Sequence, residues 1–436
     1  MKTSLNLILD DIPIPRFARV AQDLPAPRLE DIPGRMQEQL TRPEFADTVK
    51  PGQRIGITVG SRGIANMPQM VRILGDWVKS KGATPVVIPA MGSHGGATAE
   101  GQHEMLLGMG FTPDVTGCEI VSSLDVTELG EVAGLKVLYS TDALNCDGVI
   151  LMNRVKAHTD IVGPIESGLM KMATIGVGKH RGALQAHSLG LGVTGEMVQQ
   201  IAPVMFHKAN IIFGIAVLEN AFDDTRDVVL IETGKITEVE PQLLEESRQH
   251  LPQVLLRDLD VLVVNYMGKN ISGDGMDPNV LGRSLIGVKN PAMNVNKIVV
   301  LDMTPESHGN ATGIGLADIT TKRLFDQIDF TATFTNGVTS NGIAGSRIAP
   351  FMPNQKMALQ CAARLTLQPD LANLRIVRIK NTLDVAEIWV SEALLPEVAA
   401  NPALRQLSEP EELQFDDNGD LFPPASNERH DIADNC

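Results

Sequence analysis

The sequence predicts an α/β protein built from two α/β domains with an active-site cleft between them. Three observations lead to this prediction. Apolar runs of strand length alternate with helical segments, which is the pattern of a parallel sheet covered by helices. Several of these runs end in polar, Gly-rich loops, and open α/β sheets bind ligands at such strand ends. The chain has 436 residues, enough for two or three separate cores.

The first domain, expected over residues 1–252, opens with a βαβ unit. Residues 54–59 are a continuous apolar run typical of a buried strand, and residues 67–81 have the period of an amphipathic helix. Residues 84–89 give the next strand, and a helix is expected at 99–109. Because the two strands run parallel, the loops that follow them are expected at one edge of the sheet.

The rest of this domain continues the same alternation. A third apolar run covers residues 148–152, helical spacing follows over 184–205, and another strand is expected at 211–217. Polar residues again stand directly after the third run. The sequence therefore predicts that three strand ends contribute side chains to one site.

A second α/β domain is expected over residues 253–409, and an acidic, weakly patterned stretch after it predicts a loosely held tail over 410–436. The strands of the second domain again have continuous apolar runs, and its loops are rich in Gly, Asn and Asp. A charged helix at 241–257 is expected to lead into this domain, followed by strands at 260–265 and 297–302 and a helix at 316–327.

Composition narrows the classes of partner and compartment. The net charge of −16 repels polyanions, so we expect no nucleic acid partner. The four cysteines show no CxxC spacing, which argues against a zinc ribbon or a disulfide framework. The N-terminal apolar run is short and interrupted by acidic residues and prolines, unlike a secretory signal, and no run is long enough to span a bilayer. We expect a cytoplasmic protein with no membrane partner.

Three histidines and one lysine are the strongest functional signal. They stand in Gly-, Ser- and Ala-rich surroundings where core packing gives little reason for them, and they are His94, His158, Lys171 and His187. An imidazole can take up a proton, release one or bind a soft metal near neutral pH. The grouping indicates acid–base or metal chemistry.

Each histidine also has a structural alternative. His94 is flanked by residues too small to bury it, so a functional role is favoured. His158 follows a strand beside Lys156, where a solvated surface histidine is the other interpretation. His187 lies in a helical stretch, where a histidine on the helix surface is the simpler interpretation.

Lys171 lies in an apolar helical stretch. Apolar surroundings lower the pKa of a lysine and make its amine a better nucleophile, whereas the alternative is a lysine whose stem packs while its ammonium reaches water. No dinucleotide fingerprint, P-loop, HExxH or GxSxG motif occurs.

Taken together, the motifs resemble the nickel-dependent lactate racemase superfamily, which comprises 2-hydroxyacid racemases and epimerases. The order and the spacing both match. The residues that carry the resemblance are Ser61-Arg62, Gly-Ser-His-Gly-Gly-Ala-Thr at 92–98 with His94, His158, Ser-Gly-Leu-Met-Lys at 167–171, and His187. The similarity is strong in the first domain and extends to the second in outline.

The resemblance implies a cofactor and a role for each residue. The cofactor is the nickel-pincer nucleotide, a pyridinium-3-thioamide-5-thiocarboxylic acid mononucleotide that holds nickel through carbon and sulfur. It would be tethered to Lys171 and contacted by Ser61 and Arg62, with His187 as the nickel ligand. His94 and His158 resemble the paired acid–base histidines. Soft sulfur and imidazole ligands suit a square-planar nickel site.

The implied reaction inverts the C2 carbinol of a 2-hydroxy acid by hydride transfer to and from the cofactor, with the two histidines as alternate acid and base. The implied partners are proteins that synthesise the cofactor, and a homo-oligomer is compatible with the sequence. The pattern departs from lactate racemases at Leu169-Met170 and Ile175-Gly176, and the family's substrate-contacting Gln and Lys have no match in 269–279. A longer substrate such as a sugar acid is therefore open.

Three basic residues of the second domain are candidates for binding the substrate carboxylate: Lys269, Arg283 and Arg347. Two alternatives to the racemase remain from the sequence. One is a zinc-dependent hydrolase or lyase in which His94, His158 and His187 bind the metal. The other is a non-catalytic cofactor-binding homologue.

Overall fold

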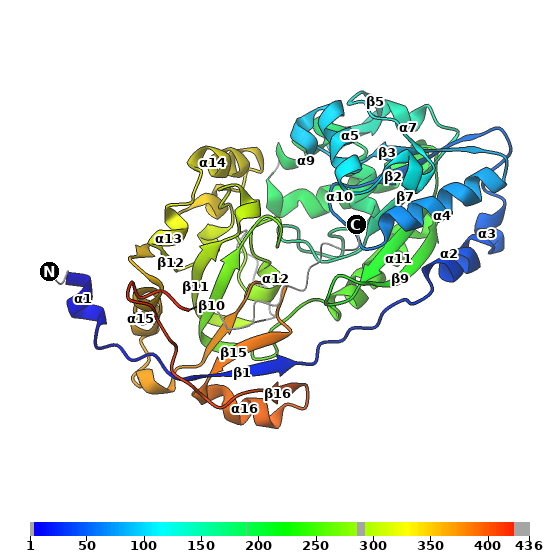
Figure 1. The fold of residues 1–436 in the computed structure, drawn as a ribbon. Coiled ribbons are helices and arrows are strands. Elements are labelled where there is room, and N and C mark those ends of the chain that lie inside the picture. Colours follow the sequence, from blue (N-terminus) through cyan, green and yellow to red (C-terminus); the bar gives the residue numbers. More distant parts are fainter. Residues whose placement is uncertain (1–3, 189, 286–292, 423–436) are drawn as a thin grey trace. The chain divides into compact units, whose positions relative to one another are not determined.

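The chain folds into two units, each with its own sheet (Figure 1). The computed structural model describes residues 4–188, 190–285 and 293–422. Among these, the first unit is Pro25–Leu251, and the second combines Leu24 and the residues before it with the chain from Pro252 onward. Both units alternate strands and helices, so the predicted α/β class is confirmed.

The sheet of the first unit has six strands in the order β4-β3-β2-β7-β8-β9. The first five are mutually parallel, and β9 is antiparallel to β8. The apolar runs predicted as strands form its centre, because a parallel sheet covered on both faces buries every residue of its strands. The bounds are β2 Arg54–Val59, β3 Thr84–Pro89, β4 Glu119–Ile120, β7 Gly148–Arg154, β8 Ile211–Glu219 and β9 Thr225–Glu232.

Alternate strand residues bury against different sets of helices. Val87 lies in one core with helices α2 and α4, whereas Val86 and Ile88 lie in the other core with α9, α10 and α11. The bounds of these helices are α2 Ile32–Leu40, α4 Met67–Ser80, α9 Lys179–Ser188, α10 Leu191–Lys208 and α11 Ile236–Arg248. The sheet is therefore the middle layer of three.

Shorter elements complete the first unit. A hairpin formed by β5 Val126–Val132 and β6 Leu135–Ser140 packs against the second core. The remaining helices are α3 Pro43–Ala46, α5 Ala99–Gly108, α6 Pro113–Thr116, α7 Thr141–Leu144 and α8 Leu169–Lys171.

Two predicted helices of the first unit differ from the structure. The stretch at 184–205 is not one helix but parts of α9 and α10. The helix predicted at 241–257 begins at Ile236 and ends at Arg248, with Pro241 inside it. Proline usually marks a helix start, whereas here the burial of Ile236 and Leu244 holds the helix together across it.

The sheet of the second unit has eight strands in the order β13-β12-β11-β10-β14-β15-β1-β16. It is parallel from β13 to β14 and antiparallel from β14 to β16. The bounds are β1 Phe17–Gln22, β10 Asp258–Met267, β11 Asn294–Met303, β12 Ile319–Thr321, β13 Phe351–Met352, β14 Ile376–Ile379, β15 Glu387–Ser391 and β16 Leu404–Gln406.

Its helices are short apart from two. They are α1 Ser4–Leu9, α12 Pro278–Leu281, α13 Lys322–Phe325, α14 Phe330–Thr339, α15 Gln355–Leu365 and α16 Leu395–Ala400. Helix α15 packs on the strands through Met357, Leu359 and their buried neighbours. Across the described parts of both units, no helix combines the length and apolar character needed to cross a membrane.

Three predictions for this unit differ from the structure. Residues 17–22, expected in the first domain, form β1 between β15 and β16. The helix predicted at 316–327 is β12 followed by the single turn α13, because Thr321 ends the strand and caps the turn through Leu324 N–H. The start of the expected loose tail is held, since Glu411 bridges Phe17; residues 423–436 lie outside the described residues.

Candidate functional site

The strand order of the first unit places the sequence-predicted loops at one edge. Strand β3 lies on one side of β2, and β7 lies on the other side, parallel to β2. Successive strands are therefore added in opposite directions from β2. Ligands of open α/β sheets bind outside the carboxyl ends of strands at such a reversal. Arg62 follows β2, His94 follows β3 and His158 follows β7.

The loop that carries His94 is a tight turn built from glycines. Gly92, Gly95 and Gly96 all have positive φ angles. A Cβ atom on Gly95 would lie 2.6 Å from the backbone nitrogen of Gln102, so a larger residue would push the loop away from the start of α5. Within this turn, the Nδ1 atom of His94 lies 2.9 Å from the carbonyl oxygen of Met91.

The surroundings of His94 keep its imidazole neutral. The residue is exposed at the surface, but its ring is partly removed from water, and this desolvation lowers its pKa below the usual value. The hydrogen bond to Met91 opposes the shift, whereas the positive charges of Arg62 and Lys171 lower the pKa further. The shift indicates that the charges of Arg62 and Lys171 lie within electrostatic range of His94.

The loop that carries His158 is tied down at both ends. Lys156 and Ser167 exchange two backbone hydrogen bonds, of 3.1 and 3.2 Å, so the exit of β7 runs beside the segment that leads to Lys171. The backbone N–H of Asp160 donates to His158 Nδ1 over 2.9 Å, and the N–H of His158 donates to Glu166 over 2.5 Å. The ring orientation is therefore fixed by backbone groups.

Glu166 is a buried carboxylate that supports this loop. Burial raises its pKa, and hydrogen bonds from the His158 backbone and from Arg248 oppose that shift. Its Oε1 atom accepts from Arg248 Nη2 of α11 over 2.7 Å. The pair anchors the His158 loop to a helix that is distant in the sequence.

Lys171 ends the short helix α8 and is followed by the π turn Met172–Gly176. Such turns are rare in proteins overall, and those that occur are often at functional sites. The side chain is half-buried, and desolvation lowers its pKa to about 8, with Asp160 opposing the shift and Arg62 adding to it. A fraction of the amine is therefore neutral and nucleophilic at physiological pH.

A second buried carboxylate, Glu240, supports the start of α8. It is 1% exposed, and its Oε2 atom accepts from the Met170 N–H over 2.9 Å. Burial raises the pKa of Glu240 to about 7. A Cβ on Gly168 would overlap this carboxylate, so the glycine of the Ser-Gly-x-x-Lys motif allows its close approach.

The sequence reasoning missed Glu166, Arg248 and Glu240, as well as the buried Lys179. The amine of Lys179 donates to the Pro89 carbonyl oxygen at the end of β3 over 2.7 Å, and burial lowers its pKa to about 8. Lys179 stands beside His180 and Arg181, and Glu240 lies in a helix with several other glutamates, so no apolar pattern marked either residue. Nothing local distinguishes Glu166 or Arg248.

The remaining predicted residues fall into two groups. Ser61 is half-buried beside Arg62, and His187 belongs to α9, but its side chain lies outside the described part of the chain. The substrate-binding candidates lie in the second unit: Lys269 Nζ donates to the Gly273 carbonyl, Arg283 pairs with Asp318, and Arg347 is exposed. Over the residues that the structure describes, no three or more His, Cys, Asp or Glu side chains group as metal ligands do.

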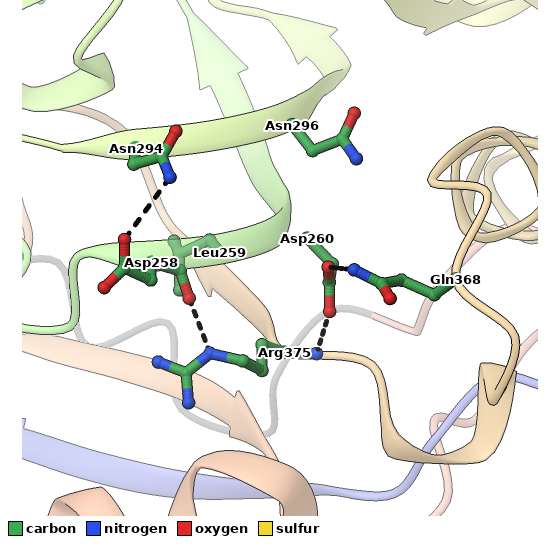
Figure 2. A pocket seen from close by; sticks show the side chains of 7 residues that line it. All are labelled: Asp258, Leu259, Asp260, Asn294, Asn296, Gln368 and Arg375. Carbon is green, nitrogen blue, oxygen red and sulfur yellow. Dashed lines mark hydrogen bonds between the residues drawn. The ribbon is translucent and has the colours of Figure 1, made fainter.

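The second unit has a separate hollow of about 470 Å³ at the amino ends of β10 and β11 (Figure 2). Asp260 accepts from the Gln368 side chain and the Arg375 backbone, over 2.8 and 2.9 Å. Asp258 accepts from Asn294, and the Arg375 guanidinium pairs with Glu397. None of the residues predicted to be functional lines this hollow.

No protein-family model matches the sequence, and no curated protein matches it. Solved structures similar to this chain include the lactate racemase apoprotein from Thermoanaerobacterium thermosaccharolyticum, with 12% identity and a TM-score of 0.46 over 84% of this chain and 89% of that one. A protein from Thermotoga maritima has 11% identity and a TM-score of 0.42 over 75% and 80% of the two chains.

Proposed function

We propose that this protein is a nickel-dependent racemase or epimerase that inverts the C2 carbinol of a 2-hydroxy acid. One observation carries the proposal: Arg62, His94 and Lys171 interact electrostatically at the carboxyl edge of the first sheet. The backbone ladder at Ser167 runs the His158 loop beside the Lys171 helix. A neutral imidazole, a weakly basic amine and an arginine at one edge can serve proton transfer and anion binding.

The residues present fit the nickel-pincer nucleotide. Lys171 has a pKa of about 8, so roughly a tenth of its amine is neutral at pH 7 and able to form an amide tether. Arg62 and Lys171 concentrate positive charge at this edge of a chain with net charge −16, which suits a phosphate-bearing group. Ser61 and Arg62 would contact the nucleotide, and His187 would bind the nickel.

The chain's own residues handle the proton of the substrate. His94 and His158 are the two proton-handling groups, and the family resemblance implies that they alternate as acid and base. When bound, the cofactor would supply the acceptor for the hydrogen on C2 and its electron pair. The neutral state of His94 leaves it ready to take the hydroxyl proton, since its pKa is lowered.

The second unit is proposed to recognise the substrate carboxylate. Lys269 follows β10 in a Gly- and Asp-rich loop whose polar groups would accept a longer hydroxylated acid. Arg347 is exposed and available for an anion, whereas Arg283 already pairs with Asp318 at 2.7 Å. We therefore rank Lys269 and Arg347 ahead of Arg283. Loading would require the proteins that synthesise the cofactor, and we propose a cytoplasmic location.

The experiment that tests this function is production of the protein in a host that synthesises the pincer nucleotide, followed by intact mass and metal analysis. We expect nickel and a covalent adduct that peptide mapping assigns to Lys171. Lys179 is the internal control, because its pKa is also about 8 but it is fully buried against Pro89. An unmodified chain that carries zinc, from a host shown to load a known pincer enzyme, would contradict the proposal.

Activity is then measured as loss of optical purity in a panel of 2-hydroxy acids, from lactate to sugar acids. Lys171→Arg keeps the charge but cannot form the tether, so we expect neither adduct nor turnover. The same absence of turnover in the fully loaded wild-type protein, across the whole panel, would also contradict the proposal.

A further inference from the structure

We propose that helix α14 is the contact through which two copies of this chain form a symmetric, reversible dimer. The inference goes beyond the proposed function and does not depend on nickel, cofactor or turnover. Helix α14 lies on the outside of the second unit (Figure 1), and it forms part of an exposed apolar surface that we call the α14 patch. The members of the patch are each between 40% and 67% exposed, and they are Phe330, Phe334, Val338, Ile343 and Phe351.

The large side chains of α14 do not face the core of their own unit. Phe330, Phe334 and Val338 are spaced four residues apart, so they form one strip along the helix, and that strip is exposed. The buried positions are small instead, namely Thr333 and Gly337. The Thr333 hydroxyl accepts from a backbone N–H of the loop after β11 over 3.0 Å. Because a surface helix normally turns its apolar stripe to the core, the exposed strip indicates a second surface that covers it.

Ring contacts carry the patch from α14 to the edge of the sheet. The Phe334 and Phe330 ring centroids lie 5.7 Å apart, and Phe330 lies 5.9 Å from Phe325 of α13. Phe325 in turn stacks on Phe351 at 4.3 Å, and Phe351 belongs to β13, the outermost strand. Four of the chain's twelve phenylalanines therefore form one cluster. A continuous apolar surface of this kind marks an interaction site, whereas scattered exposed side chains do not.

The lack of charge on the helix favours a second copy of the chain as the partner. A chain with net charge −16 repels its own copies wherever carboxylates face each other. Helix α14 reads Phe-Thr-Ala-Thr-Phe-Thr-Asn-Gly-Val-Thr and has no charged residue, so two copies can meet there without like charges coming together. A basic partner would find no carboxylate on the helix, and a polyanion is repelled by the chain as a whole.

The charges that border the helix are already used within the chain. On the neighbouring α13, Lys322 pairs with Asp326, and Arg323 pairs with Asp302. The carboxylate of Asp329 caps α14 by accepting from a backbone N–H of its first turn over 2.9 Å. The border of the α14 patch therefore adds little repulsion between two copies.

The order of the side chains along α14 suits a two-fold axis. If two α14 helices cross antiparallel at Phe334, that ring meets its own copy, and Phe330 of each chain faces Val338 of the other. A large side chain then meets a smaller one at both ends of the contact. The antiparallel arrangement also sets the positive end of each helix dipole beside the negative end of the other. A two-fold contact closes on itself, so association stops at the dimer.

The area of the patch sets the strength of the dimer. A large side chain has about 150–250 Å² of surface, so the exposed fractions of the five members leave roughly 400 Å² of apolar surface per copy. Two copies remove about twice that area from water, and the threonines alongside bring the total to about 1,000–1,200 Å². This is the lower limit for a specific interface. We therefore expect a reversible dimer with a Kd of about 1–100 μM.

Sedimentation velocity of the full-length protein tests the dimer, at total concentrations from about 1 to about 200 μM. We expect the average mass to rise from that of one chain toward that of two. Phe334→Asp sets a carboxylate against its own copy and should raise the Kd at least about 100-fold. Leu367→Asp is the control, because Leu367 is 86% exposed in the same unit but lies outside the patch. A wild-type chain that stays monomeric throughout, or a Phe334→Asp variant that dimerises like the wild type, would overturn the proposal.

A mixing experiment tests the two-fold arrangement. Phe334→Lys should be monomeric for the same reason as Phe334→Asp, since like charges meet at the axis. In an equimolar mixture, each introduced carboxylate can face an introduced ammonium group. We expect the two variants to bind each other at least about tenfold more tightly than either binds itself. Recovery in the mixture also shows that both variants are folded. If the mixture stays as monomeric as its components, residue 334 does not face its own copy and the proposed dimer is wrong.

Discussion

The charged groups at the carboxyl edge of the first sheet and those in the hollow of the second unit have different surroundings. At the edge, burial lowers the pKa values of His94 and Lys171, and nearby positive charges, including Arg62, lower both further. In the hollow, Asp260 and Arg375 have their charges satisfied by neighbouring side chains and backbone (Figure 2). Groups whose pKa values are shifted by burial and by nearby charges cluster at functional sites. The difference favours the edge as the site, although the hollow is the more obvious cavity.

The largest expected effect comes from Lys171→Met. The variant should lose the covalent adduct and all turnover while becoming more stable. Lys171 has a pKa of about 8 in the folded chain against 10.5 ordinarily, so the protonated amine destabilises the fold below pH 8. Allowing for its partial exposure, removing it should raise the free energy of unfolding by roughly 1–2 kcal/mol at pH 7.

The sign of this effect can be followed with pH. Between pH 8 and 10.5, the unfolded chain binds more protons than the folded chain at this site, so wild-type stability rises with pH. The advantage of Lys171→Met should therefore shrink between denaturation curves at pH 7 and pH 9.5. Lys50→Met, at an exposed lysine of the same unit, is the control and should change neither curve. A less stable Lys171→Met protein at pH 7 would remove the contrast between edge and hollow.

Gly168→Ala should come next. The added Cβ displaces the Glu240 carboxylate from the Met170 N–H, and overpacking of this kind costs about 1–3 kcal/mol. Gly163→Ala is the matched control, because its Cβ would meet no atom closer than 4.0 Å. Urea denaturation measures both. Equal stability of the two variants would show that Glu240 is not fixed at the start of α8.

Arg248→Met tests the support of the His158 loop. It leaves Glu166 buried without its ion pair and should cost about 2 kcal/mol, below the usual value for a buried pair because the Arg248 side chain is 33% exposed. Glu245→Gln is the control, since it removes the exposed partner of the same arginine and should cost almost nothing. Thermal unfolding distinguishes the two, and matching melting temperatures would contradict the anchoring role of Glu166.

The smallest effect is expected from Arg62→Gln. Removing this positive charge should raise the pKa of His94, and an NMR titration of the ring measures the change. Arg181→Gln removes an exposed arginine of α9 and serves as the charge-matched control. A His94 titration that is the same in both variants would mean that Arg62 does not act on the ring.

The sequence was sufficient for the centre of the first sheet. Residues 54–59 and 84–89 are strands as predicted, because burial on both faces leaves an unbroken apolar run that is visible locally. Parallel strands end at one edge of their sheet, and Arg62 and His94 follow neighbouring parallel strands, so the sequence placed them together. The proximity of Lys171 to both was implied only by the family resemblance.

Long-range support could not be predicted. Glu166 and Arg248 are 82 residues apart, and Met170 and Glu240 are 70 apart, so no local pattern connects them. The helix expected at 316–327 was wrong because the apolar spacing of so short a segment fits a helix or a strand equally well. Residues 319–321 form the strand β12, and Thr321 ends it and caps the short helix α13.

Strand β1 has a consequence for how the protein is made. It pairs with β15 and β16, whose residues are synthesised more than 360 positions later, since Phe17 faces Ser391 and Val20 faces Gln406. The whole first unit lies between these partners in the chain. On the ribosome, the first unit can fold as soon as Leu251 has emerged. Until β15 and β16 are made, neither edge of β1 has the strand it pairs with in the folded protein. The order of folding during translation is thus the reverse of the order in which the two units begin.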